Sequence, residues 1–226
     1  MFPNKATKRR RDDDILDAVH YNDLEDSIYL IGDTEIHFTA NVNDRHIERL
    51  KRLIAQVVQD SKKKLKPISD GDDFDDASTT ERDFFITYVV NSPGGSVSSV
   101  LGLVDYIRVL KSKYKNLKFH SIATGCVASA GTIMCVVADK KTITKNTFAM
   151  IHELSGSPGF TNYTKLQSHA EYTKKLHDVM VNIYLTNTGK DPSDKNEVAE
   201  LERKLLRESW LSSEEYKEQG FVDEII

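Results

Sequence analysis

Apolar and polar positions along the chain alternate between strand-like and helix-like patterns, in an order typical of α/β proteins. Runs of aromatic and β-branched residues predict strands at 28–31, 84–90, 117–123, 141–144, 147–151 and 221–226. Apolar residues at helical spacing predict helices at 43–59, 97–110, 129–138, 162–188 and 195–206, and a capping box at Ser212 and Glu215 predicts a short last one. The alternation from residue 84 onward predicts right-handed crossovers and a mostly parallel sheet covered by helices.

Two segments lack this patterning. Residues 1–25 are polar and charged, with a basic run at 8–11 beside an acidic run at 12–14, which predicts a flexible N-terminal segment. A nuclear-import or nucleic-acid patch is the alternative for that basic run. Residues 61–83 hold twelve charged and four apolar residues, which predicts a mobile surface insertion in a single domain spanning 26–226. The insertion is either a solvated loop without a role or a partner-binding or regulatory loop.

Composition narrows the class of protein. A chain of 226 residues is long enough to bury a hydrophobic core that needs no disulfide or metal for its stability. With 31 basic and 35 acidic residues the net charge is −4, which argues against a nucleic-acid binder. No apolar run approaches the roughly 20 residues of a membrane span, and the first 25 residues lack a signal-peptide core. Cys126 and Cys135 are expected to be buried reduced thiols, as in a soluble cytoplasmic protein without a metal site.

The first candidate for chemistry is Ser129, within the sequence GCVASAG at 125–131. This serine lies among small residues where a predicted strand passes into a predicted helix. A helix N-terminus supplies unpaired N–H groups and a positive dipole end, which stabilise an oxyanion formed beside the serine. The alternative is a serine that only caps the helix.

The second candidate is the turn SPGG at 92–95, which follows a predicted buried strand. Its two glycines permit close approach of the backbone to a ligand. Their N–H groups can line a site at the carboxyl end of the sheet, where α/β proteins usually bind ligands. The alternative is a tight strand-to-helix turn, and no Gly-Lys-Ser/Thr follows to make it a phosphate-binding loop.

A histidine and a carboxylate complete the set. His152 ends an apolar strand, and Glu208 lies in RESWLS near the end of a predicted helix. Taken singly, each is more typical of a structural residue. Together with Ser129 and the glycine turn, they supply a nucleophile, a base, an acid to orient the base, and backbone donors, which is the set that acyl transfer requires.

These motifs carry a family resemblance. NSPGG, GCVASAG, MIHE and RESWLS, in this order, resemble the proteolytic subunit of the Clp protease. The resemblance runs from about residue 86 to 226, and more loosely from residue 26. It implies an α/β fold of the crotonase-like type, a β-α superhelix with a protruding handle that matches residues 155–188.

The resemblance also implies roles for individual residues. Carried over position by position, it makes Ser129 the nucleophile, His152 the general base and Glu208 the third member of the triad. It further assigns backbone and substrate positions: Gly94 and Ala130 to the oxyanion hole, and Gly95, Ser96 and Leu154 to the bound peptide strand.

For partners, the resemblance implies a homo-oligomer that encloses its substrate. In the family, heptameric rings stack in pairs as a tetradecamer, and an ATP-driven unfoldase threads unfolded polypeptides into the chamber. No metal or organic cofactor is implied for peptide cleavage. The expected activity is therefore that of a serine endopeptidase, acting without nucleic acid or membrane.

The chain departs from the family pattern at several places. Glu208 stands where the family usually has Asp, and Leu206 where it has an acidic residue near the ring–ring contact. Thr87 and Val89 replace aromatic residues that help to dock the unfoldase, close to the charged insertion. These changes suggest a different or modified partner.

Other functions of the same fold stay open as alternatives. One is a catalytically weak or silent ring subunit that assembles with active paralogues. A second is a protease of the viral capsid-maturation type. Signal-peptide peptidases and crotonase-fold hydratases fit less well, because the first need a membrane segment and the second do not explain the ordered Ser, His and acidic motifs.

Overall fold

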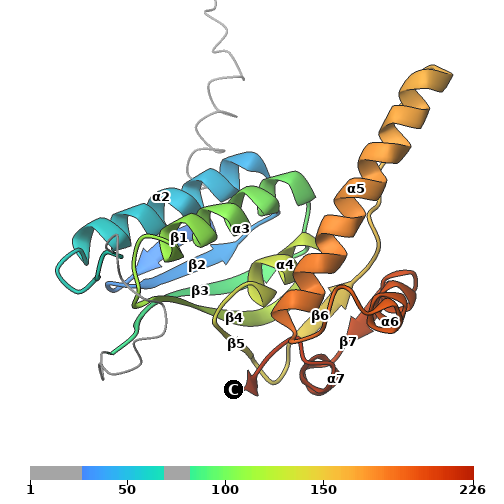
Figure 1. Cartoon of the computed structure of the whole chain (residues 1–226). Helices are drawn as coiled ribbons and strands as arrows, with labels where there is room; N and C mark the ends of the chain where they lie inside the picture. The colour runs from blue at the N-terminus through green and yellow to red at the C-terminus, as the bar shows by residue number, and fades with distance from the viewer. Residues whose placement is uncertain (1–26, 69–81) are drawn as a thin grey trace, which may run out of the picture.

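A computed structural model of the protein describes residues 27–68 and 82–226. Figure 1 shows a twisted sheet with helices α2 and α3 lying side by side over one face, while helix α5 projects away from the body of the molecule. The predicted N-terminal segment 1–25 and the middle of the predicted insertion, 69–81, lie outside the described residues.

The element order follows the alternation predicted from the sequence. The strands are β1 (Ile28–Ile31), β2 (Glu35–Thr39), β3 (Phe84–Ser92), β4 (Leu117–Ala128), β5 (Lys140–Ile143), β6 (Phe148–Ile151), β7 (Ser209–Leu211) and β8 (Glu224–Ile225). The helices are α2 (Asp44–Asp60), α3 (Val97–Lys111), α4 (Ala130–Val136), α5 (Tyr163–Asn187), α6 (Lys195–Leu205) and α7 (Ser213–Glu218). The capping box of α7 at Ser212 and Glu215 is confirmed.

The sheet is mostly parallel, as predicted, and it forks at β4. Its main path runs β1-β2-β3-β4-β5-β8. Among the strands within residues 27–68 and 82–226, β1–β2 and β6–β7 pair antiparallel and the other pairs are parallel. The first half of β4, from His120 to Ala123, pairs with β5, whereas its last residues, Cys126 to Ala128, pair with β6. The fork therefore places the end of β6 beside the end of β4.

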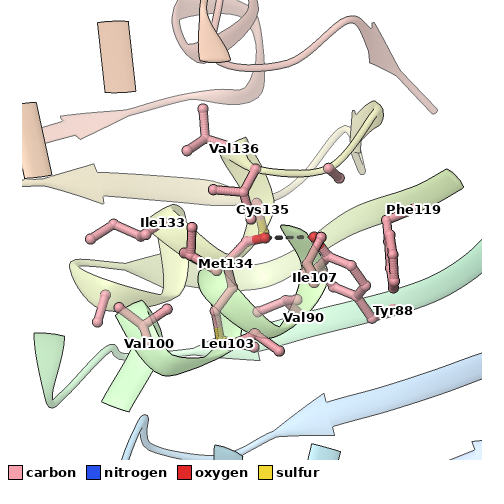
Figure 2. Close-up of a cluster of buried hydrophobic side chains, with 14 of the residues drawn as sticks. Tyr88, Val90, Val100, Leu103, Ile107, Phe119, Ile133, Met134, Cys135 and Val136 are labelled. Atoms are coloured by element: carbon pink, nitrogen blue, oxygen red, sulfur yellow. Dashed lines mark hydrogen bonds between the residues drawn. The ribbon is translucent and has the colours of Figure 1, made fainter. Parts of the chain in front are cut away.

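The core fills the space between the sheet and the helices. Figure 2 shows buried side chains of β3, β4 and α3 packed around α4, where the Tyr88 hydroxyl donates a hydrogen bond to the Met134 carbonyl at 2.7 Å. Cys135 is fully buried here, and burial raises the pKa of its thiol to about 12, so the thiol stays neutral. Cys126 is only partly buried, which corrects the expectation of two buried cysteines.

Two predicted boundaries in the sheet are wrong. The sequence predicts that the strand from residue 117 ends before Gly125, but β4 continues through this glycine to Ala128. Gly125 adopts a φ of 61° there, and the Asn91 side-chain oxygen accepts a hydrogen bond from the Cys126 amide at 3.4 Å. Strands β2 and β7, which the sequence analysis did not predict, are also present, and the last predicted strand shortens to β8.

The beginning of the predicted insertion is packed rather than mobile. Leu65 is buried against the core. The Asn116 side chain donates to the Lys64 carbonyl and accepts from the Lys66 amide, both at 2.9 Å. Residues 61–68 are therefore held against the loop before β4, so the prediction of a mobile insertion is wrong for this part of it.

None of the helices within 27–68 and 82–226 is both long and apolar enough to cross a bilayer.

Candidate active site

Ser129 lies at the junction of β4 and α4 in a strained backbone conformation. Its φ of 53° and ψ of −126° lie in a region that L-residues rarely adopt, at a cost of about 1–3 kcal/mol that the surrounding structure must offset. The Ser129 amide donates to the Met150 carbonyl of β6 at 2.8 Å. The hydroxyl makes no capping bond to α4, so the alternative of a simple helix cap does not describe this side chain.

His152 directly follows β6 and meets the Ser129 hydroxyl. Pairing of Ala128 with Met150 brings the two strand ends together. His152 Nε2 lies 2.7 Å from Ser129 Oγ, within reach for proton transfer. The His152 side chain is 15% exposed, so the histidine is largely shielded from bulk water.

Glu208 lies on the other side of the imidazole, at a longer distance. Antiparallel pairing of Ile151 with Ser209 carries it there, and its own φ of 46° turns the chain before β7. Glu208 Oε1 lies 3.9 Å from His152 Nδ1, which is ion-pair range but longer than a hydrogen bond. Its side chain is 73% exposed, so water screens the attraction between the two groups.

The two expected oxyanion donors differ in their surroundings. Ala130 is the first residue of α4, so no preceding turn of the helix supplies an acceptor for its amide. The Gly94 amide instead donates to the buried Ser92 hydroxyl at 3.1 Å. Gly94 still lies against Ser129, because a Cβ built on it would lie 2.6 Å from Ser129 Cβ. Only a glycine allows the 92–95 turn to approach Ser129 this closely.

A cavity opens beside the serine and the histidine. Its wall includes Ser129, Ala130, His152 and two of the expected peptide-contact residues, Gly95 and Leu154. Its apolar side is formed by Val97, Ile133, Met180 and Tyr184. The cavity thus places Ser129 and His152 beside an apolar surface.

The backbone of Gly95 is aligned for pairing with an extended peptide. The Val42 amide donates to the Gly94 carbonyl at 2.8 Å, and the Ser96 amide donates to the Val42 carbonyl at 2.7 Å. In a strand, the peptide groups of successive residues point to opposite sides, so the N–H and C=O of Gly95 face away from Val42. Ser96 is not among the residues that line the cavity; its side chain caps α3 by accepting from the Ser99 amide.

Two hydroxyl residues that were not predicted from the sequence, Thr132 and Tyr184, lie next to the backbone of Ser129. Thr132 Oγ1 lies 2.6 Å from the Ser129 carbonyl oxygen and 2.6 Å from the Tyr184 hydroxyl. Burial raises the pKa of Tyr184, so its phenol stays protonated and able to donate. A threonine three residues after the serine was a usable signal for the first contact, whereas nothing local marks Tyr184, 52 residues further on.

Comparison with known proteins agrees with the motifs. The model of the Clp protease family matches residues 76–226. The ATP-dependent Clp protease proteolytic subunit of Streptococcus gordonii is 33% identical over 156 residues, which cover 68% of this chain and 73% of that protein. The protein of the same name from Streptococcus pneumoniae is 31% identical over the same shares. The chain therefore belongs to the Clp protease family of peptidases.

Proposed function

We propose that this protein is a serine endopeptidase that hydrolyses unfolded polypeptides with Ser129, His152 and Glu208. The observation that carries the proposal is the 2.7 Å contact between Ser129 Oγ and His152 Nε2. Serine hydroxyls are weak nucleophiles and need a base at this distance. Glu208 acts as the electrostatic partner that favours the imidazolium formed during the reaction.

The reaction proceeds through an acyl-enzyme. Ser129 Oγ attacks the peptide carbonyl carbon as its proton passes to His152 Nε2, and a tetrahedral oxyanion forms. His152 then protonates the departing amine as the C–N bond breaks. A water molecule attacks the remaining ester with His152 again as base, which releases the acid product and restores Ser129.

Backbone groups bind the oxyanion and the substrate in this scheme. The Ala130 amide donates to the oxyanion, and the Gly94 amide joins it by exchanging Ser92 Oγ for the oxyanion. An extended peptide adds as a strand beside Gly95 and Leu154, with one side chain in the apolar part of the cavity. No metal or cofactor takes part.

The assembly belongs to the proposal as well. We place the chain in the crotonase-like superhelix, with residues 155–188, including α5, as the handle. The functional form is a homo-oligomer of heptameric rings, stacked as a tetradecamer, that receives substrate from an ATP-driven unfoldase. Leu206 is 63% exposed, which leaves an apolar side chain where the family has an acidic one near the ring–ring contact. Thr87 and Val89 are half-buried on the face of the sheet that α2 and α3 do not cover, and they replace aromatic residues that help to dock the unfoldase in the family.

A fluorophosphonate probe tests the proposed nucleophile. The assembled protein is expected to be labelled at Ser129, as mapped by peptide mass spectrometry, and a Ser129→Ala variant of the same native mass is expected to stay unlabelled. Labelling at another residue, or no labelling of assembled wild-type protein, would contradict the assignment.

A weak or silent ring subunit is the second candidate function, and the exposed position of Glu208 favours it. Measured turnover of a fluorogenic peptide separates the two candidates. Turnover by wild type above the Ser129→Ala background supports the peptidase, and equal rates support the silent subunit.

Glu208 is expected to contribute less than a fully buried triad acid. Glu208→Ala should lower kcat by about 10- to 100-fold, below the roughly 10⁴-fold typical of buried triad carboxylates, because water already screens its charge. Steady-state kinetics on the same peptide measure the effect. Glu208→Gln keeps the shape but removes the charge, so a fall equal to that of Glu208→Ala assigns the effect to charge. A loss as large as that of Ser129→Ala would contradict the expectation.

A further inference from the structure

The carbonyl of Ser129 is held by two donors from one residue. Thr132 donates its amide to the Ser129 oxygen at 2.9 Å and its hydroxyl to the same oxygen at 2.6 Å. The amide bond belongs to the turn that begins α4. The hydroxyl bond is additional, and Thr132 has no solvent exposure, so water does not replace it.

The same hydroxyl links Ser129 to α5. Thr132 has a single hydroxyl proton, and that proton is committed to the Ser129 carbonyl. At the 2.6 Å contact with Thr132 Oγ1, Tyr184 is therefore the donor. Tyr184 is 1% exposed, and its ring packs edge-on against Phe221 at 5.8 Å, which holds the ring and its hydroxyl oxygen in place. A chain of two hydrogen bonds thus runs from α5 to the nucleophile's backbone.

Fixing this carbonyl also fixes the amide on the other side of the peptide bond. The peptide group is planar and trans, so the C=O of Ser129 and the N–H of Ala130 point in opposite directions within one rigid plane. A donor that holds the Ser129 oxygen therefore aims the Ala130 N–H. The positive φ of Ser129 makes this support necessary, because an unsupported residue would relax toward the commoner backbone regions.

We propose that Thr132 and Tyr184 are positioning residues that aim the oxyanion-binding N–H of Ala130 and tie it to helix α5. The pair acts through the plane of the peptide bond between Ser129 and Ala130 and does not touch the reacting atoms. This inference rests on the proposed serine-peptidase function. It implies that a shift of α5 alters the oxyanion site without moving the Ser129 hydroxyl.

Three variants separate positioning from packing. Thr132→Val removes the hydroxyl at constant volume, Thr132→Ser restores it, and Tyr184→Phe removes only the phenolic oxygen. Tyr88→Phe is the matched control, since it also deletes a buried tyrosine hydrogen bond, but one made to the Met134 carbonyl rather than to Thr132 or Ser129. Each variant is assembled, weighed by native mass spectrometry, and assayed for kcat and KM with a fluorogenic peptide.

A misaimed donor weakens binding of the transition state more than binding of the substrate. Thr132→Val is therefore expected to lower kcat by about 10- to 100-fold, where the larger value is the effect of removing one oxyanion donor completely. KM should change by less than about threefold. Tyr184→Phe should lower kcat by about three- to tenfold. The hydrogen bond from the Thr132 hydroxyl to the Ser129 carbonyl remains, but the Thr132 hydroxyl no longer accepts the bond from Tyr184 that strengthens it. Thr132→Ser should recover most of the rate, and Tyr88→Phe should keep the wild-type kcat.

Each remaining outcome overturns the inference in a recognisable way. If Tyr184→Phe and Thr132→Val match Tyr88→Phe in kcat, the pair only packs. If KM rises while kcat holds, the Tyr184 hydroxyl affects only substrate binding in the cavity and does not position the backbone. If Thr132→Val does not assemble, a kcat of Tyr184→Phe equal to that of Tyr88→Phe still overturns the inference. Wild-type protein that neither turns over peptide nor reacts with the probe at Ser129 refutes the proposed function itself, and this inference with it.

Discussion

Replacing His152 by alanine is expected to lower kcat for peptide hydrolysis by about 10⁴-fold or more, the loss typical of removing the base from a serine triad. Its Nε2 lies 2.7 Å from Ser129 Oγ, and without it the hydroxyl proton has no acceptor as the bond to the substrate forms. Native mass should be unchanged, because the imidazole sits in the wall of the cavity and not in the core. Stopped assays with a fluorogenic peptide, at enzyme concentrations high enough to detect the residual rate, measure the effect.

The matched control and a double variant sharpen this test. His120→Ala removes another part-buried histidine, whose Nε2 lies 3.0 Å from Thr142 Oγ1 on the neighbouring strand β5, and should keep the wild-type rate. Groups that act as a unit are not additive, so Ser129→Ala combined with His152→Ala should be no slower than either single variant. Multiplied losses in the double variant would show that the two residues act independently.

Replacing Gly95 by alanine is the second change with a large expected effect. Gly95 has a φ of 145°, which L-residues avoid, and an added Cβ would lie 2.2 Å from the Val42 carbonyl oxygen. The backbone must move at Gly95 or at Val42, which breaks the β-bridge between these two residues. The movement also displaces the backbone of Gly95, which we propose pairs with the substrate peptide. We expect a loss of about 2–4 kcal/mol in the free energy of unfolding, together with near-complete loss of peptide hydrolysis.

Urea unfolding and peptide kinetics on Gly95→Ala check both parts of this expectation. Gly156→Ala is the control, because a Cβ there meets nothing within 4 Å and its φ is not in the left-handed region. It should change the free energy of unfolding by less than about 0.5 kcal/mol. Wild-type stability and activity in Gly95→Ala would mean that the close approach to Val42 is not needed.

The sequence predicted the parts of the molecule that local patterns encode. Alternating strand and helix patterns gave the mostly parallel sheet, and the apolar positions of 43–59 gave the buried face of α2. His152 directly follows the predicted strand 147–151, whereas Ser129 lies at the start of the predicted helix 129–138, several residues beyond the predicted strand 117–123. Their approach depends on the extension of β4 to Ala128 and its pairing with β6, which the local pattern did not predict.

Features that depend on distant contacts could not be predicted in this way. Gly125 resembles a strand end, yet pairing with β6 carries β4 past it. Ser129, between β4 and α4, and Glu208, between α6 and β7, have a positive φ that contradicts their intrinsic preferences. The exposure of Glu208 and the bond from Gly94 to Ser92 likewise depend on how whole segments pack, so the residue types alone do not reveal them.

The pairing of β7 with β6 connects the segment around His152 to the C-terminal part of the chain. The segment that carries His152 is held by residues about 50 to 60 positions further along the chain. The Glu153 N–H donates a hydrogen bond to the Leu205 carbonyl, and Ile151 pairs with Ser209. Synthesis proceeds from the N-terminus, and a domain folds as a unit, so Ser129 and His152 leave the ribosome before these partners do. The proposed Ser129–His152 site is therefore expected to become ordered only after residues 205–211 have also left the ribosome and paired with the segment around β6.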